Sequence, residues 1–346
     1  MVKTVEIVSL SSGTIGEPFA AHELKIGIDR LRSMGLLVKF SSHALKGIEY
    51  IKHHPEDRAA DLIEAYSDPE VDMILCAIGG DDTYRLLPYL FEDDSLKKVV
   101  NDKIFLGFSD TTINHFMLHK LGVNTFYGQS FLADICELDS DMLPYSRQYF
   151  EELITTGTIK EIHPSDVWYQ ERTAFDESQI GVPRVEHENK GFELLQGASC
   201  FSGRILGGCI ESMYDVFNNE RYQDSVELCD KYGLFPSLDD WKGRILLLES
   251  SEEKPAPDMY EKMLVALKEY GVFGAVSGVL IGKPIDETYA EEYKKLLVSV
   301  IDDPDLPILC NINIGHATPR CIIPFGIDAR VDADKQVITF GIREDR

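Results

Sequence analysis

The fold and the chemistry of this 346-residue chain are best approached from residues 104–112, IFLGFSDTT. A short apolar run ends in Gly107, a serine follows two residues later, and a helical pattern begins at once. This layout is that of a nucleophile elbow, in which a serine on a tight strand-to-helix turn exposes its hydroxyl group. The backbone N–H that follows such a serine can stabilise an oxyanion. Ser109 and Asp110 also fit a helix N-cap, so the spacing alone leaves both interpretations open.

Strand and helix patterns alternate around this stretch in the first half of the chain. Nearly continuous apolar runs at residues 5–10, 71–78 and 104–106 predict buried strands. Amphipathic segments at residues 19–34 and 56–66 predict helices between them. Repeated β-α-β order with such strands favours a parallel sheet that carries helices on both faces. Ligands of such sheets bind beyond the carboxyl ends of the strands.

A break in the pattern sets the expected domain boundaries. We expect an N-terminal α/β domain over residues 1–160 that carries the nucleophile. Residues 161–191 hold Trp168 and Pro183 without a sustained period, which is typical of a connection or a long active-site loop. Residues 192–346 mix further strands and helices and predict a second, smaller α/β domain.

Composition limits the class of protein. The formal net charge of −25 disfavours nucleic acid and anionic membranes as partners, and 44% hydrophobic residues suffice for a large core. The seven cysteines are an odd number without a C-x-x-C spacing, which indicates a reducing compartment and no structural zinc. His115 and His119 have i, i+4 spacing but no acidic residue completes a metal site. With no signal-peptide pattern and no apolar stretch of about 20 residues, we expect a cytoplasmic protein.

Three polar residues stand at the ends of apolar strands: Ser109, Glu249 and His316. A serine nucleophile needs a base, and histidine serves near neutral pH when a carboxylate fixes its tautomer. Their order along the chain is that of α/β-hydrolases, although Thr111 departs from the G-x-S-x-G form. Taken singly, Glu249 fits an exposed strand-end carboxylate and His316 fits a structural turn residue.

A second turn, GGDDT at residues 79–83, follows a strand and opens a helix. Its glycines allow a ligand to approach the backbone closely, and amides at a helix start stabilise negative charge. The turn is therefore a candidate for half of an oxyanion hole or for a phosphate cradle, since GGDGT loops occur in lipid and NAD kinases. A plain tight turn with an Asp cap is the third interpretation. A kinase leaves Ser109, Glu249 and His316 without a role, and Asp82 replaces the glycine of the kinase loop.

Six segments together resemble the serine LD-carboxypeptidases, and within them the microcin C immunity (MccF-like) peptidases. They follow one another over about residues 70–325 and are specific only as a set. The segments are AIGGDD with RLLP (77–88), GFSDTT (107–112), TFYG (125–128), GRILGG (203–208), GRILLLE (243–249) and GHATP (315–319).

The resemblance implies two domains, with a partly barrel-like sheet in the smaller C-terminal one, and a homodimer that needs no metal or other cofactor. It implies that Ser109 is the nucleophile, His316 the general base and acid, and Glu249 the carboxylate that orients the histidine. The oxyanion donors are then backbone amides at Gly80 and Asp110. The reaction implied is hydrolysis of an amide bond near a carboxyl-bearing terminus.

Two substrate classes follow from the resemblance: murein tetrapeptides, and conjugates of an aminoacyl group or peptide with a nucleotide. The segment 249–255 and the loop around Trp168 look more like the MccF-like group, in which a loop tryptophan stacks on the base. Asp81, Trp168 and Lys254 are the substrate-binding candidates, although Trp168 also fits a structural role. Cys209 stands where the family often has Asn, which leaves that contact open.

Two alternatives of other classes remain at this point. A phosphotransferase or nucleotide-binding protein would use the GGDDT loop, and a non-catalytic binding protein would keep the fold without the chemistry.

Overall fold

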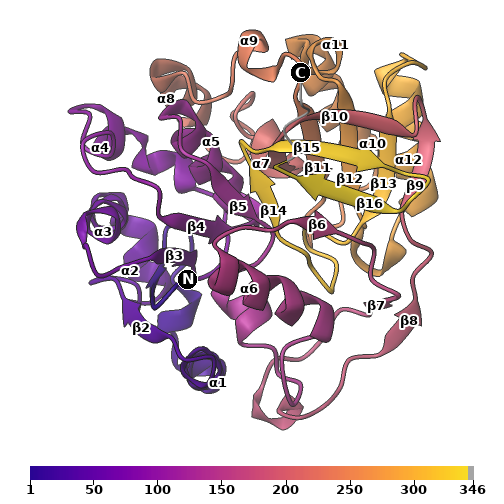
Figure 1. Cartoon of the computed structure of the whole chain (residues 1–346). Coiled ribbons are helices and arrows are strands. Elements are labelled where there is room, and N and C mark those ends of the chain that lie inside the picture. Colours follow the sequence, from indigo (N-terminus) through magenta and orange to yellow (C-terminus); the bar gives the residue numbers. More distant parts are fainter. Residues whose placement is uncertain (342–346) are drawn as a thin grey trace.

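The computed structural model describes residues 1–341 and builds them on two main β-sheets. Figure 1 shows the first sheet among the indigo and violet helices of the N-terminal half, with the second sheet beside it. The predicted α/β class, with a parallel sheet in the N-terminal part and a second sheet in the C-terminal part, is confirmed.

Five strands of the first sheet are parallel, and a sixth, from the C-terminal half, joins the edge antiparallel to its neighbour. The central strands are buried along their whole length, as expected of a sheet covered on both faces. In spatial order the strands are β14 (Ile323–Phe325), β5 (Thr125–Tyr127), β4 (Ile104–Gly107), β3 (Met73–Cys76), β1 (Thr4–Val8) and β2 (Leu37–Phe40).

The helices of the first half connect these strands and cover the sheet. Short 3-10 turns precede several of them, including η3 (Thr83–Leu86) after the GGDDT loop and η4 (Ser109–Thr111) at the elbow. The helices are α1 (Ala21–Ser33), α2 (Ile48–His53), α3 (Pro55–Ser67), α4 (Leu87–Phe91), α5 (Thr112–Lys120) and α6 (Pro144–Thr156).

The second sheet has eight strands, of which four adjacent ones, from β10 to β13, are parallel. It is an open sheet and no closed barrel, because its edge strands β6 and β9 are not paired with each other within residues 1–341. In spatial order the strands are β6 (Glu161–Ile162), β16 (Val337–Phe340), β15 (Asp328–Asp332), β10 (Cys200–Cys209), β11 (Ile245–Glu249), β12 (Gly278–Gly282), β13 (Ile308–Ile312) and β9 (Glu193–Gln196).

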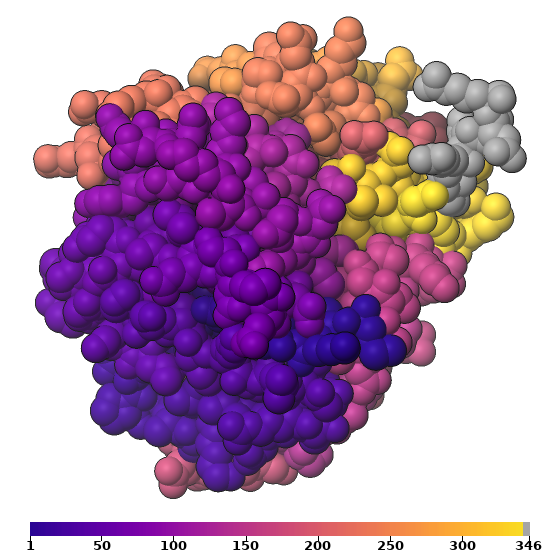
Figure 2. All heavy atoms as spheres, turned by 60° about the vertical axis from the view of Figure 1, so that its left-hand side comes forward, coloured from indigo at the N-terminus to yellow at the C-terminus, as the bar shows by residue number. Residues whose placement is uncertain are grey.

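Helices of the second half pack on this sheet and also reach the first half. Figure 2 shows orange residues of the second half lying against the violet surface of the first. Tyr84 of η3 donates a hydrogen bond of 2.5 Å to Asp224, which links the two halves. The helices are α7 (Ile210–Tyr214), α8 (Ser225–Tyr232), α9 (Leu238–Trp241), α10 (Pro257–Tyr270), α11 (Val272–Ala275) and α12 (Ala290–Ile301).

Two strands cross the expected sequence boundaries. β6, within residues 161–191, belongs to the second sheet, and β14, within residues 192–346, completes the first. The division of the chain at residues 160 and 192 stays a prediction. In the part of the chain that is described, no helix has the length and apolarity needed to cross a membrane.

Candidate active site

The elbow at Ser109 is a strained turn between β4 and α5. Ser109 has φ of +66°, a left-handed backbone conformation that costs a non-glycine residue about 1–3 kcal/mol. The GGDDT loop leaves it no spare room, because a Cβ on Gly79 would lie 2.6 Å from Ser109 Cβ and 2.7 Å from its Oγ. The loop after β3 therefore packs directly against the serine, where it can contribute backbone amides to the site.

The three strand-end residues meet in space. His316 Nε2 lies 2.9 Å from Ser109 Oγ, and His316 Nδ1 lies 2.7 Å from Glu249 Oε2. Glu249 and His316 are buried, whereas Ser109 is partly exposed. This order of hydroxyl group, imidazole and carboxylate is the arrangement that activates a serine for nucleophilic attack. In it the imidazole takes the hydroxyl proton and the carboxylate orients the ring and stabilises the imidazolium.

Tyr127, at the end of β5, links the carboxylate to the elbow. Its hydroxyl group donates a hydrogen bond of 2.6 Å to Glu249 Oε1 and accepts one of 3.1 Å from the backbone N–H of Ser109. Both oxygens of Glu249 are thus hydrogen-bonded. The segment 125–128 belongs to the sequence resemblance, but only the fold shows that this hydroxyl group reaches two members of the site.

A second carboxylate shares the outer nitrogen of the histidine. Glu252, on the loop after β11, places Oε2 at 3.1 Å from His316 Nε2 while its side chain stays 70% exposed. Burial opposes a charge on the imidazole, but Glu249 and Glu252 outweigh it and raise the pKa of His316 to about 10. The hydrogen bond from His316 lowers the pKa of Glu252 to about 2. Contact with Glu252 therefore favours the charged form of the imidazole. The sequence interpretation did not include Glu252.

Two buried polar residues, Asp110 and His115, hold the elbow in place through hydrogen bonds. Asp110 Oδ2 accepts hydrogen bonds from Ser11 Oγ at 2.6 Å and from the backbone N–H of Thr83 at 3.0 Å, which joins the elbow to the ends of two other loops. His115 lies between Thr125 Oγ1 at 2.7 Å and the carbonyl oxygen of Gly107 at 3.1 Å, and burial lowers its pKa to about 3. His115 is therefore a neutral packing residue, and the prediction that it serves packing agrees with this position.

Asp82 of the GGDDT loop lies in a buried ion pair and does not face an open cradle. Its Oδ1 is 2.6 Å from Nη1 of Arg58 on α3, and neither side chain is more than 4% exposed. Removal of one partner of such a pair leaves an uncompensated buried charge. The pair holds the loop whose glycine contacts Ser109, so loop position and stability are coupled here.

We expect Arg58→Ala to lower the free energy of unfolding by about 3–5 kcal/mol, because Asp82 then stays buried without a counter-ion. The loss in the free energy of unfolding is measured by urea denaturation followed by fluorescence. Arg85→Ala is the matched control, because Arg85 is 3.9 Å from the same carboxylate but 33% exposed. A loss below about 1 kcal/mol for Arg58→Ala, the range of exposed pairs, would contradict the structural role of the pair.

The mouth of the site carries a cluster of charges around one guanidinium group. Arg221 lies 2.9 Å from Glu253, 3.2 Å from Asp215 and 3.5 Å from Asp81. Asp81, a predicted substrate-binding residue, is thus exposed at the mouth and engaged by Arg221. The cluster joins the GGDDT loop to the loop that bears Glu252, and carboxylates outnumber the cation within it.

Lys254, the second substrate-binding candidate, is held by an acidic partner. Its ammonium group lies 2.7 Å from Asp286 Oδ2 on η7 (Ile285–Glu287). Asp286 also accepts a hydrogen bond of 2.9 Å from the backbone N–H of Glu171. Lys254 therefore ties the loop after β11 to the segment around residue 171.

Trp168, the third candidate, lies in β7 (Val167–Tyr169), which pairs with β8 (Glu186–Glu188). Its ring stacks on His187 at 4.2 Å, and the ammonium group of Lys283 is 5.1 Å from its centroid, so it is only 8% exposed. The next residue, Tyr169, donates its backbone N–H to the carbonyl oxygen of Thr318 at 2.9 Å. The strand thus runs beside the loop of His316, with the tryptophan covered by the protein's own side chains.

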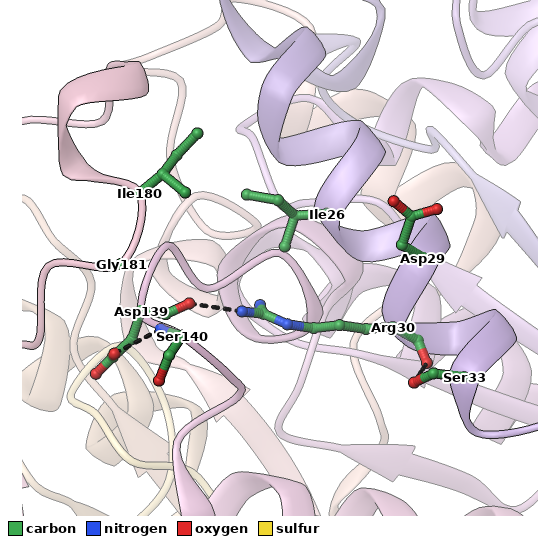
Figure 3. Close-up of a pocket in the computed structure, with 8 residues that line it drawn as sticks. All are labelled: Ile26, Asp29, Arg30, Ser33, Asp139, Ser140, Ile180 and Gly181. Carbon is green, nitrogen blue, oxygen red and sulfur yellow. Dashed lines mark hydrogen bonds between the residues drawn. The ribbon is translucent and has the colours of Figure 1, made fainter.

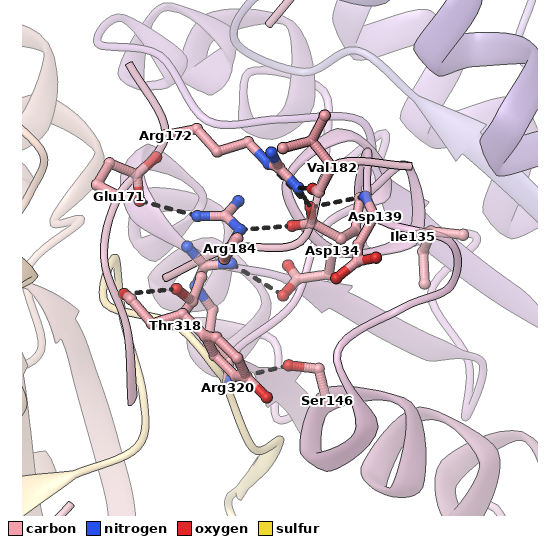
Figure 4. Close-up of polar contacts among 12 residues, drawn as sticks. Asp134, Ile135, Asp139, Ser146, Glu171, Arg172, Val182, Arg184, Thr318 and Arg320 are labelled. Atoms are coloured by element: carbon pink, nitrogen blue, oxygen red, sulfur yellow. Dashed lines mark hydrogen bonds and ion pairs between the residues drawn. The ribbon is translucent and has the colours of Figure 1, made fainter. Parts of the chain in front are cut away.

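Arginines anchor this region (Figure 4). Arg320 donates to the carbonyl oxygen of His316 at 2.8 Å, bonds to that of Gly315, and pairs with Asp134 at 2.9 Å. Its guanidinium group also lies 4.7 Å from the centre of the Phe108 ring. Arg320 therefore fixes the loop that carries His316 and packs on the residue before Ser109.

The segment between β7 and β8 is anchored by a second set of ion pairs. Arg172 and Arg184, drawn in Figure 4, lie 2.8 and 2.7 Å from the two oxygens of Glu137. Burial opposes a charge on this carboxyl group, but the two guanidinium groups outweigh it and lower the pKa of Glu137. Both ends of the segment are thereby held to the N-terminal half.

Cys209 is buried at the end of β10, next to the site. Its backbone N–H donates to Thr112 Oγ1 at 2.9 Å, and its Sγ lies 3.2 Å from Glu211 Oε2. Glu211 in turn accepts from the backbone N–H of Ser251 at 2.9 Å. The cysteine therefore takes part in a buried network that supports the loop after β11.

A hollow of about 360 Å³ between α1 and residues 139–140 and 180–181 is separate from these residues (Figure 3). Figure 3 shows Arg30 of α1 extending across it to the carbonyl oxygen of Asp139, at 2.7 Å. None of Ser109, Glu249 and His316 lines it. Across residues 1–341, no group of three or more His, Cys, Asp or Glu side chains is placed to hold a metal ion.

The fold and the site define a serine-type hydrolase in which Ser109 of the first half meets Glu249 and His316 of the second. Residues 5–128 match the LD-carboxypeptidase N-terminal domain and residues 202–331 match the LD-carboxypeptidase C-terminal domain of peptidase family S66. The chain belongs to the LD-carboxypeptidase family, and it is a serine-type carboxypeptidase. The predicted family is thereby confirmed. The match to a peptidase family favours a hydrolase over the alternative of a phosphotransferase that uses the GGDDT loop.

Three relatives are similar to most of the chain. An MccF-like protein from Streptococcus pneumoniae, solved in complex with AMP, is 63% identical over 99% of both chains with a TM-score of 0.98. The microcin C7 self-immunity protein MccF of Escherichia coli is 25% identical over 82% of this chain and 78% of its own. A probable murein peptide carboxypeptidase of Bacillus subtilis is 26% identical over 91% and 86%.

Proposed function

We propose that Ser109, His316 and Glu249 form the catalytic triad and that the enzyme cleaves an amide bond between an aminoacyl group or short peptide and a nucleotide. The observation that carries the triad is the pair of contacts made by His316, 2.9 Å to Ser109 Oγ and 2.7 Å to Glu249 Oε2. The nucleotide is supported by the AMP complex of the relative that shares 63% identity with this chain.

In the proposed mechanism His316 Nε2 takes the hydroxyl proton while Ser109 Oγ bonds to the scissile carbonyl carbon. The resulting oxyanion accepts hydrogen bonds from the backbone amides of Gly80 and Asp110. The tetrahedral species then breaks its carbon–nitrogen bond, and the leaving nitrogen takes the proton from His316. Water, deprotonated by the same histidine, hydrolyses the acyl-enzyme and restores Ser109.

The nucleotide part of the substrate would extend from this centre toward the strand of Trp168. That strand lies beside the loop of His316, and an indole face is suited to stacking on a base. His187 stacks on the indole in the structure, so the base would replace His187 as its partner. Asp81 and Lys254 are held in ion pairs at the mouth and would contact the substrate by exchange of these partners.

A murein tetrapeptide is the second candidate substrate. The likeness to the probable murein peptide carboxypeptidase favours it, at 26% identity over 91% of this chain. The deciding experiment is parallel incubation of the protein with murein tetrapeptide and with an aminoacyl phosphoramidate of adenosine, followed by mass spectrometry. We expect release of the amino acid from the nucleotide conjugate at the higher kcat/KM. Exclusive loss of the terminal D-alanine from the tetrapeptide would contradict the proposal and favour the murein peptidase.

A homodimer completes the proposal, as the sequence resemblance implies. Size-exclusion chromatography with light scattering measures it, and twice the 39.0 kDa mass of the chain is expected. A species of 39.0 kDa at all concentrations would contradict it.

A further inference from the structure

Glu252 occupies the reaction centre without a role in the triad. Its Oε2 lies 3.1 Å from His316 Nε2, the same nitrogen that faces Ser109 Oγ at 2.9 Å. Glu249 already orients the imidazole through Nδ1. Glu252 therefore competes with the serine for the outer nitrogen, from a side chain that is 70% exposed and reaches the centre from the solvent side.

The charges around Glu252 leave it open to a cationic ligand. Within the described residues, its one salt bridge is to His316. The nearby cations have other partners, since Arg221 contacts three carboxylates and Lys254 is held by Asp286. Carboxylates are thus in excess at the mouth, and a substrate cation is favoured there over a substrate anion.

We propose that Glu252 binds the free α-ammonium group of the aminoacyl part of the substrate, and thereby selects substrates whose α-nitrogen is not acylated. The inference rests on the proposed function. The α-nitrogen is two bonds from the scissile carbonyl carbon, which must lie against Ser109 Oγ. An ammonium group at that distance is within reach of a carboxylate that contacts the neighbouring imidazole, and it offers three hydrogen-bond donors.

Binding of the ammonium group also frees the base. Glu252 exchanges the imidazolium of His316 for the ammonium group of the substrate, and the imidazolium releases its Nε2 proton to solvent. Nε2 then accepts a hydrogen bond from Ser109 Oγ, and the triad is ready for attack. An N-acylated substrate has no positive charge at this place, so it leaves Glu252 on the histidine.

The test compares two substrates and three proteins. The substrates are an aminoacyl phosphoramidate of adenosine with a free α-amine and its N-acetyl counterpart. Glu252→Gln removes the charge at the centre. Glu161→Gln is the matched control, because Glu161 is also an exposed carboxylate that pairs with a histidine, at 3.2 Å from His163, but stands apart from Ser109, Glu249 and His316. The readout is kcat/KM for each pair, measured by chromatography of the released nucleotide.

We expect the wild type to prefer the free amine by about 10- to 100-fold, the range of a hydrogen bond between charged groups. Glu252→Gln should remove this preference, because it lowers the kcat/KM of the free amine and raises that of the N-acetyl substrate, for which Glu252 no longer holds the base. Glu161→Gln should keep the preference. Equal cleavage of both substrates by the wild type, or an equal loss for both in Glu252→Gln, overturns the inference and leaves the proposed function intact.

A binding measurement keeps the inference testable if neither conjugate is cleaved, a result that would reject the proposed function. Calorimetry with aspartyl sulfamoyl adenosine and its N-acetyl form, on Ser109→Ala with and without Glu252→Gln, needs no turnover. Tighter binding of the free amine that disappears with Glu252→Gln supports the inference. Equal binding of the two forms, or no binding, overturns it.

Discussion

Ser109→Ala is expected to lower kcat by about 10⁴- to 10⁶-fold, because the substitution removes the atom that attacks the carbonyl carbon. The fold should persist. The Ser109 side chain makes one hydrogen bond, to His316 Nε2, and alanine has the same Cβ contacts with Gly79 as serine. The measurement is single-turnover hydrolysis of the nucleotide conjugate, together with thermal unfolding of both proteins.

The control for this prediction is the same substitution at a serine outside the site. Ser67 on α3 donates its hydroxyl proton to the carbonyl oxygen of Ile63 at 2.7 Å, so Ser67→Ala should keep wild-type kcat. If Ser109→Ala retains kcat within about tenfold of the wild type, the loss expected for a nucleophile is absent and another group attacks. If Ser109→Ala unfolds at a much lower temperature than Ser67→Ala, the rate loss is not evidence for a nucleophile.

The sequence predicted the parts of this site that depend on local pattern. Ser109, Glu249 and His316 each stand at the end of an apolar strand, which marked them in the sequence. Ser109 follows β4 of the first sheet whereas Glu249 and His316 stand at the ends of β11 and β13 of the second, so their meeting depends on how the two sheets pack. The parallel sheet of the first half followed from its continuous apolar runs. The same reasoning missed β14, because the pairing of residues 323–325 with β5 joins segments about 200 residues apart in sequence.

Residues that act through long-range contacts were not predicted. Tyr127 and Arg320 reach the site only because β5 and the loop after β13 lie next to it, and no spacing in the sequence records that. Glu252 sits among several acidic residues in the segment 249–255, so its contact with His316 could not be distinguished from ordinary surface charge. Trp168 was predicted either to stack on a base or to be structural, and the structure adds that His187 stacks on its ring.

Glu249→Gln is the second substitution that we expect to have a large effect, because both carboxylate oxygens of Glu249 accept hydrogen bonds. One oxygen faces His316 Nδ1 at 2.7 Å and the other accepts from the Tyr127 hydroxyl group at 2.6 Å. A glutamine side chain has one acceptor and one donor, so it cannot accept from both. The amide then either loses the bond to Tyr127 or forces the imidazole into the tautomer with its proton on Nε2. We expect kcat to fall by about 10³- to 10⁴-fold, as for a triad with the wrong tautomer.

Tyr127→Phe separates the two parts of this effect. It removes the hydrogen bond to Glu249 Oε1 but leaves the carboxylate on His316, so a smaller loss of about 10- to 100-fold is expected. Equal losses for Glu249→Gln and Tyr127→Phe would mean that the carboxylate does not act on the tautomer of His316.

The charge of Glu249 has a separate readout in the pKa of His316. Two carboxylates raise that pKa to about 10 in the free enzyme, against the opposing effect of burial. Since the base must be neutral, kcat/KM should rise with pH through this pKa, and removal of either carboxylate should move the rise to lower pH. NMR titration of the imidazole in Glu249→Gln and Glu252→Gln measures the shift without turnover. An unchanged titration in Glu249→Gln would contradict the ion pair with His316. A shift in both variants would show that the histidine is held between two carboxylates, of which only the exposed one is placed to move when a substrate binds.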